Sequence, residues 1–153
     1  MRERYGFDMD APDALERARR LAGEAPGEAE PALLLAAVLA TRGDPAAAEA
    51  EVRRALELSP RLPRAHTTLA TLLMQRGARE EAVRSARNAA ALDREDPTVL
   101  YNLGLAEWFA GERRTARAAF DRAAEALGAT ASAATATAGA SRRPWWRRIG
   151  HRG

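Results

Sequence analysis

The sequence predicts an all-α protein, an α-solenoid of antiparallel helix pairs. One pattern of leucine, alanine and glycine returns every 34 residues without an insertion, as in Leu35, Leu69 and Leu103. Aromatic residues make up only 5% of the chain, and alanine supplies much of its apolar content. This composition favours close-packed helices over β-sheets, because alanine has the highest helix propensity. Self-similarity at a fixed period of this length indicates a stack of helix–turn–helix repeats.

Small residues and a mid-repeat glycine recur in register with the leucines. The glycine column is Gly43, Gly77 and Gly111, and three alanine columns begin at Ala36, Ala48 and Ala55. With this pattern and the run Leu100-Tyr-Asn-Leu-Gly104, the chain resembles the tetratricopeptide repeat (TPR) family. The resemblance covers residues 29–128 and implies three full repeats, at 29–62, 63–96 and 97–130.

The residues before the first full repeat predict a lead-in and a half-repeat. Residues 1–9 show no periodicity and are expected to form a flexible lead-in. Asp10 and Pro12 are typical of a helix start, as the N-cap and an early proline. The apolar residues that follow align with the second helix of repeat one, so 10–28 is predicted to be a half-repeat that caps the array. The alternative is that the chain is a fragment of a longer array.

Prolines and glycines mark the predicted helices of each repeat. The first helices are expected to begin near Pro31, Pro63 and Pro97 and to end at the glycine column, because glycine readily adopts the left-handed backbone of such a turn. Asp44 and Pro45 then predict the start of the second helix of repeat one, as the N-cap and the first helical residue.

One acidic residue occupies a column that is otherwise apolar. Glu107 stands in the column of Leu39 and Leu73. A buried carboxylate without a partner is costly. We therefore expect Glu107 to reach solvent or to pair with an arginine such as Arg113 or Arg114.

Catalysis, cofactors and metals have little support in the sequence. The chain has no cysteine, which removes thiolate nucleophiles and cysteine-ligated metals together. It also lacks a phosphate-binding glycine-rich motif, a nucleophile elbow and a metal-ligand cluster. Of its two histidines, His66 is expected to be a packed, hydrogen-bonded structural residue rather than a ligand or a base, and His151 lies near the C-terminus. We expect no enzyme activity, no cofactor and no bound metal.

A non-catalytic protein–protein interaction scaffold or adaptor is the function that the resemblance implies. In TPR proteins the first helices of successive repeats line a concave groove that binds a peptide or a helix. The residues expected to contact a partner there are Arg64, Thr67, Thr71, Met74, Tyr101, Leu105 and Trp108. Tyr101, Leu105 and Trp108 fall on one helix face, and an apolar face of this kind suits a partner groove. The alternative is that they pack on a neighbouring helix or on the C-terminal tail.

The 34-residue period is lost from residue 129 onward. Residues 129–141 are rich in alanine, threonine and serine and are typical of a flexible linker; a continuation of the last helix is the competing interpretation. Residues 142–153 form a basic tail with tryptophan. The residues expected to attach this tail to a surface are Arg142, Arg143, Trp145, Trp146, Arg147 and Arg148.

The basic charge of the chain is concentrated in this tail. All 24 basic residues are arginine, and five of them follow residue 141, which leaves 19 against 21 acidic residues before it. The alternative function is therefore peripheral tethering through this tail, to an anionic membrane surface or to nucleic acid. Nucleic acid is disfavoured, because the near-neutral solenoid offers no basic stripe. No apolar segment resembles a signal peptide or a membrane span, so a cytoplasmic location is expected by default.

Overall fold

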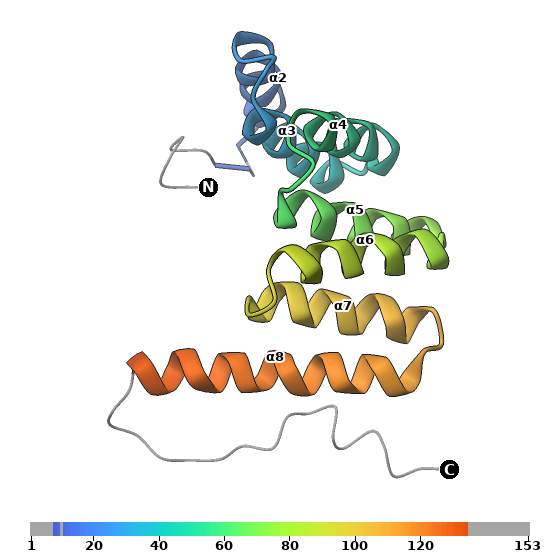
Figure 1. The fold of residues 1–153 in the computed structure, drawn as a ribbon. Helices are drawn as coiled ribbons and strands as arrows, with labels where there is room; N and C mark the ends of the chain where they lie inside the picture. Colours follow the sequence, from blue (N-terminus) through green and yellow to red (C-terminus); the bar gives the residue numbers. More distant parts are fainter. Residues whose placement is uncertain (1–7, 10, 135–153) are drawn as a thin grey trace.

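The computed structural model describes residues 8, 9 and 11–134, which form a stack of seven helices with no strand among these residues. In chain order the helices are α2 (Ala14–Glu24), α3 (Ala29–Thr41), α4 (Pro45–Leu58), α5 (Pro63–Arg76), α6 (Arg79–Leu92), α7 (Pro97–Phe109) and α8 (Arg113–Ala134). Figure 1 shows them following one another from α2 at the top to α8 at the bottom. The predicted all-α solenoid is confirmed.

The turn inside each repeat is built on a left-handed glycine. Gly43, Gly77 and Gly111 have φ angles of 82°, 84° and 89°. At the second turn the Ala78 N–H donates to the Leu73 carbonyl at 2.9 Å, a bond that closes the end of a helix when the residue before the donor is left-handed. The predicted turns of all three repeats therefore lie at the glycine column.

Aspartates before proline begin two of the helices. The Asp44 side chain accepts a hydrogen bond from the Ala47 N–H at 3.0 Å, ahead of Pro45 at the start of α4. Asp96 accepts from two backbone N–H groups at the start of α7. These bonds satisfy backbone donors that the first helical turn leaves unpaired.

The predicted start of the first helix at Asp10 is wrong. Helix α2 begins at Ala14, and Asp13 occupies its N-cap position without a side-chain cap bond. The preceding residues form a turn instead, in which the Ala14 N–H donates to the Ala11 carbonyl at 3.0 Å. Asp10 itself lies outside the described residues. The alanines of α2 nevertheless join the core that α3 and α4 form, as a half-repeat would.

The end of the array also differs from the predicted boundary. Helix α8 continues past Gly128 to Ala134, so the first part of the predicted linker is helical, as in the competing interpretation. The physical reason is the high helix propensity of alanine, which sustains a helix without a core contact at every turn. Residues 135–141 and the tail at 142–153 lie outside the described residues.

The core runs through the stack as two clusters of small and medium-sized apolar residues. The first cluster joins α2 to α6, and the second joins α5 to α8. Gly104 on α7 faces Phe120 on α8 so closely that a Cβ atom on Gly104 would lie 2.6 Å from the ring. This glycine is therefore required for the close approach of the last helix pair, not for a turn.

Candidate functional site

The predicted partner-binding residues lie on α5 and α7, which pack against each other. Arg64 on α5 reaches back to the preceding repeat, where its Nη2 lies 2.9 Å from the Oε2 atom of Glu30 on α3. The two residues are 34 apart and occupy the same column. The charge of Arg64 is therefore already paired in the free protein, and this ion pair bridges α3 and α5.

The two threonines of the predicted set have little free hydrogen-bonding capacity. The Thr67 hydroxyl donates to the Pro63 carbonyl and the Thr71 hydroxyl donates to the Thr67 carbonyl, each at 3.1 Å. Both side chains are half-buried. Met74, which is also half-buried, packs against both core clusters. These three residues therefore form a half-buried, mainly apolar surface on α5.

The exposed part of the predicted set lies on α7. Tyr101 is 37% exposed and Trp108 is 41% exposed, and Leu105 between them is half-buried. We call these three residues the α7 stripe. The Tyr101 ring also meets the Phe120 ring, with 5.6 Å between centroids. The α7 stripe thus packs partly on α8, as the alternative interpretation expected, and still leaves both aromatic rings more than one third exposed.

A cation lies over the second aromatic ring of the α7 stripe. The guanidinium carbon of Arg113 is 4.0 Å from the centroid of the Trp108 ring, within the distance of a cation–π contact. Arg113 belongs to the first turn of α8. This contact joins α8 to the indole on α7 and places a positive charge beside an exposed apolar surface.

Exposure in one column rises along the array. Leu33 on α3 is 3% exposed, Thr67 on α5 is half-buried, and Tyr101 on α7 is 37% exposed. Among the described helices no further pair follows α8. The last described repeat therefore presents an apolar face at a position that the first repeat buries.

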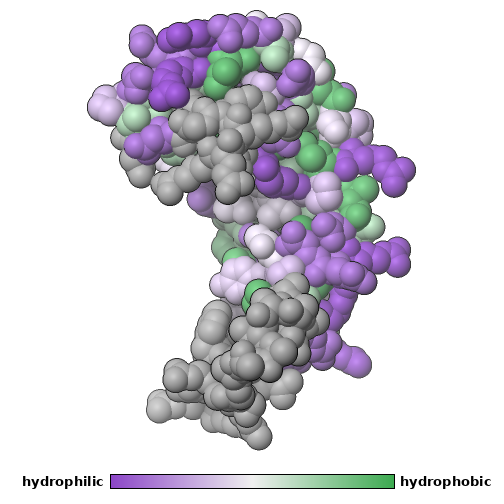
Figure 2. Space-filling model, turned by 90° about the vertical axis from the view of Figure 1, so that its left-hand side faces the viewer, coloured by the Kyte–Doolittle hydropathy of each residue, from purple (hydrophilic) through white to green (hydrophobic). Residues whose placement is uncertain are grey.

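Hydrophilic residues dominate the part of the surface that is coloured in Figure 2, with small hydrophobic patches among them. The described residues contain few large apolar side chains that are exposed, and three of them, Tyr101, Trp108 and Phe109, lie on α7.

The expectation that Glu107 pairs with an arginine is confirmed, but the arginine is Arg87 and the carboxylate does not reach solvent. The Glu107 side chain is buried, with 4% of the residue exposed, and its partner is neither Arg113 nor Arg114. The Nε and Nη2 atoms of Arg87 on α6 donate to the Glu107 Oε1 atom at 3.1 and 3.0 Å, and Arg87 also donates to the Glu112 carboxylate. The hydrogen bond to Glu107 raises the pKa of Arg87 above its ordinary value. The buried carboxylate is therefore neutralised from a different helix.

Sequence reasoning also missed Phe109, which is exposed beside Trp108. The guanidinium carbon of Arg79 lies 5.4 Å from the centroid of its ring. The signal that could have found it is its column, which holds the polar residues Thr41 and Gln75 in the two earlier repeats. An aromatic residue that interrupts a polar column is unusual and marks a local change of surface.

Other sequence expectations have mixed outcomes. The His66 Nε2–H donates to the Pro60 carbonyl at 2.8 Å, in keeping with its expected structural role. Within the described part of the chain, no three His, Cys, Asp or Glu side chains gather as a metal site, and no helix has the length and apolarity needed to cross a bilayer. The tail residues Arg142, Arg143, Trp145, Trp146, Arg147 and Arg148 lie outside the described residues, so tethering stays a prediction.

Comparison with known proteins identifies the fold. No protein-family model matches the chain, and no curated protein matches it. A crystal structure of MamA is 21% identical with a TM-score of 0.70, over 78% of this chain and 70% of that chain. A thermophilic TPR protein of Thermus thermophilus is 22% identical with a TM-score of 0.67, over 74% of this chain and 64% of that chain.

PilF of Pseudomonas aeruginosa is 26% identical with a TM-score of 0.68, over 74% of this chain and 52% of that chain. The chain thus spans about half the length of PilF and just under two thirds of the Thermus protein. These likenesses show that the chain has the fold of a TPR protein.

Proposed function

We propose that this chain, with its TPR fold, is a non-catalytic scaffold or adaptor that binds a peptide or a helix of a partner protein. The proposed site is the groove along α3, α5 and α7. Solenoids of stacked helix pairs present extended concave surfaces of this kind to their partners. The observation that carries the proposal is the α7 stripe, whose two aromatic rings stay more than one third exposed, whereas most leucines of α3, α5 and α7 are buried.

The surroundings of the α7 stripe suggest which partner fits it. Tyr101 and Trp108 offer ring surfaces, and Met74 supplies an adaptable thioether on the neighbouring helix. Arg113 beside Trp108 adds a positive charge, which a carboxylate of the partner would neutralise. A segment with apolar anchors at helical spacing and a nearby acidic residue has the complementary chemistry.

The test begins with a ligand obtained without knowledge of the natural partner. Peptides selected from a random library on the full chain are titrated against the Trp108→Ala variant. Truncating a buried interface aromatic commonly costs about 2 kcal/mol or more, so the affinity should fall at least about tenfold. The melting temperature should stay within a few degrees, because much of the indole is already exposed.

Leu127→Ala is the matched control, because Leu127 is a large exposed apolar residue that lies outside the proposed groove, on α8. It should leave the affinity unchanged. A large loss of stability in Trp108→Ala with unchanged affinity would instead make Trp108 a core residue and refute the groove.

A further inference from the structure

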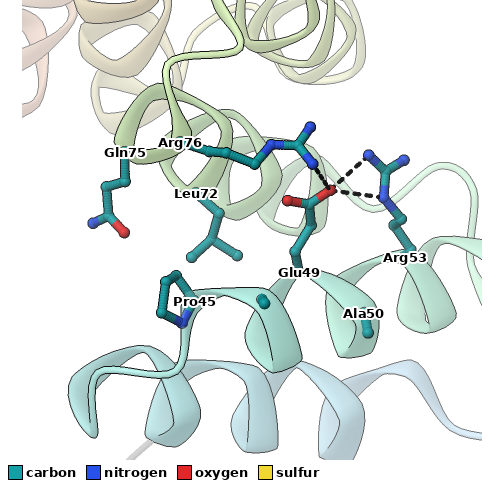
Figure 3. A pocket seen from close by; sticks show the side chains of 8 residues that line it. Pro45, Glu49, Ala50, Arg53, Leu72, Gln75 and Arg76 are labelled. Atoms are coloured by element: carbon teal, nitrogen blue, oxygen red, sulfur yellow. Dashed lines mark hydrogen bonds and ion pairs between the residues drawn. The ribbon is translucent and has the colours of Figure 1, made fainter.

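A pocket of about 420 Å³ opens between α4 of the first repeat and α5 of the second. It lies where these two helices meet, not along the groove of α3, α5 and α7. Its lining comprises Pro45, Ala46, Glu49, Ala50, Arg53, Leu72, Gln75 and Arg76. Figure 3 shows the Leu72 side chain pointing from α5 toward Pro45 on α4. The pocket therefore has an apolar interior with polar side chains around it.

Paired charges form one wall of this pocket. The Glu49 Oε1 atom lies 2.8 Å from the Arg53 Nη2 atom and 3.5 Å from the Arg76 Nη1 atom, as the dashed lines in Figure 3 mark. Glu81 on α6 pairs with the same two arginines at 3.4 and 3.5 Å. Both guanidinium groups are about half exposed. The wall is thus held in place without a net charge, and it offers two planar cations at its surface.

The next junction of the array, between α6 and α7, has different residues at the positions equivalent to the pocket lining. A shift of 34 residues places Arg79 at the position of Pro45, Val83 at that of Glu49 and Phe109 at that of Gln75. There the guanidinium of Arg79 lies over the ring of Phe109 at 5.4 Å. Because the counterparts of these two residues both line the pocket, the Phe109 ring marks the equivalent place. The junction of α6 and α7 supplies from its own chain an aromatic side chain that the junction of α4 and α5 lacks.

We propose that the pocket between α4 and α5 binds an aromatic side chain of a partner protein, in the place that Phe109 takes one repeat later. The volume falls in the range of about 300–1,000 Å³ that is common for ligand sites. The apolar interior matches the ring, and the guanidinium groups of Arg53 and Arg76 can stack on its face. This site is separate from the proposed groove and does not depend on the α7 stripe.

The test uses two capped amino acids as probes on the full chain. N-acetyl-L-phenylalanine amide and N-acetyl-L-alanine amide are titrated while the methyl signals of Ala46 and Ala50 are followed by NMR. The aromatic probe should shift both signals with a dissociation constant on the order of 1 mM, and the alanine probe should not. Equal shifts with both probes, or none with the aromatic probe, would overturn the proposal.

Two substitutions at one position separate filling of the pocket from loss of the glutamine. Gln75→Phe copies the residue that Phe109 provides one repeat later, so it should fill the pocket and weaken the aromatic probe at least about tenfold. Gln75→Ala should keep the binding, because it leaves the pocket open. A Gln75→Phe variant that melts no lower than the wild type and still binds the probe would refute the site.

The tail of the same chain is the rival occupant, because it carries two tryptophans at 145 and 146. The double variant Trp145→Ala/Trp146→Ala should bind the aromatic probe with unchanged affinity if the occupant comes from a partner protein. A tighter probe affinity in this variant, by about tenfold or more, would show that the tail competes for the pocket and would overturn the assignment to a partner.

Discussion

Gly104 and Phe120 show how single residues set the distance between helices. In the first two repeats the corresponding pairs are Ala36 with Val52 and Ala70 with Ala86. The largest residue of the second-helix column thus stands opposite the smallest residue of the first-helix column. A Cβ atom at Gly104 would lie 2.6 Å from two ring atoms of Phe120, and Phe120 is buried, so the ring has little room to move.

The effect of one added methyl group at Gly104 on the free energy of unfolding should therefore change sign with the residue at position 120. In the wild type, Gly104→Ala should be destabilising, because overpacking costs about 1–3 kcal/mol against a gain of about 1 kcal/mol in helix propensity. In the Phe120→Val background, which copies the pair of repeat one, the same methyl should be neutral or stabilising. Urea denaturation of the four proteins measures the cycle. Equal effects in both backgrounds would show that the ring does not limit this position.

The buried Glu107 carboxylate and its half-exposed partner Arg87 predict a second asymmetry. Arg87→Met should cost about 3 kcal/mol, because it leaves the Glu107 carboxylate buried without its partner. Glu107→Leu in the same background should recover most of that loss, since it restores the leucine of the two earlier repeats. Arg64→Met is the control: it breaks an ion pair whose arginine and glutamate side chains are 45% and 29% exposed, and it should cost about 0–1 kcal/mol. If Arg87→Met and the control variant lowered the melting temperature equally, the burial of Glu107 would not matter for stability.

The sequence predicted an arginine partner for Glu107 but did not identify Arg87, and the 34-residue register explains why. The register aligns residues of the same column in successive repeats, and so it identifies buried positions such as Leu35, Leu69 and Leu103. Arg87 and Glu107 belong to different columns and lie 20 residues apart on two packed helices. Their contact depends on how far a long side chain reaches between helices, which a one-dimensional pattern does not encode.

At the scale of helices and turns, the left-handed glycine determines the turn between the two helices of each repeat. Gly77→Val should destabilise more than Arg76→Ala. The left-handed backbone costs a residue with a Cβ atom about 1–2 kcal/mol, and a β-branched residue is a stronger outlier. Nothing lies within 4 Å of a Cβ built on Gly77, so the loss would come from the backbone and not from a clash.

Arg76 is a suitable comparison because it is adjacent, exposed and bound only through ion pairs of 3.5 Å. Its removal should cost about 0–1 kcal/mol. The melting temperatures of Gly77→Val and Arg76→Ala, measured under the same conditions, test this prediction. Equal losses would mean that the glycine column does not serve backbone geometry.

The sequence predicted helix boundaries well where prolines, aspartates and glycines mark them, as at Asp44, Pro45 and Gly77. It failed at both ends of the described array. At the first helix, Asp13 instead of Asp10 occupies the N-cap position, and the helix begins at Ala14. At the last, an alanine-rich stretch beyond Gly128 continued α8 because no residue interrupts it. Helix ends fray, and a local sequence pattern determines their exact residues least well.

At the scale of the whole molecule, the two proposed binding sites use different junctions of the stack. The groove uses the exposed face of α7, and the pocket lies between α4 and α5. Helix α5 contributes to both, through Met74 and Thr71 on one side and Leu72 and Gln75 on the other. A partner that engaged both sites would gain affinity from the second contact without new chemistry, because that contact forms at a high effective concentration.

The distribution of charge over the whole chain yields the final prediction. The tail carries five arginines and no acid, whereas the preceding residues are near neutral. If the tail tethers the protein, the full chain should bind vesicles that contain phosphatidylserine, because each arginine near an anionic surface contributes about 1 kcal/mol. A chain that ends at Ala134, where α8 ends, should not bind them. The binding should weaken steeply with added salt, since screening acts over about 10 Å at 0.1 M. Equal vesicle binding by the two chains in a sedimentation assay would place the attachment in the helical array, and no binding by either would remove the membrane from the set of partners.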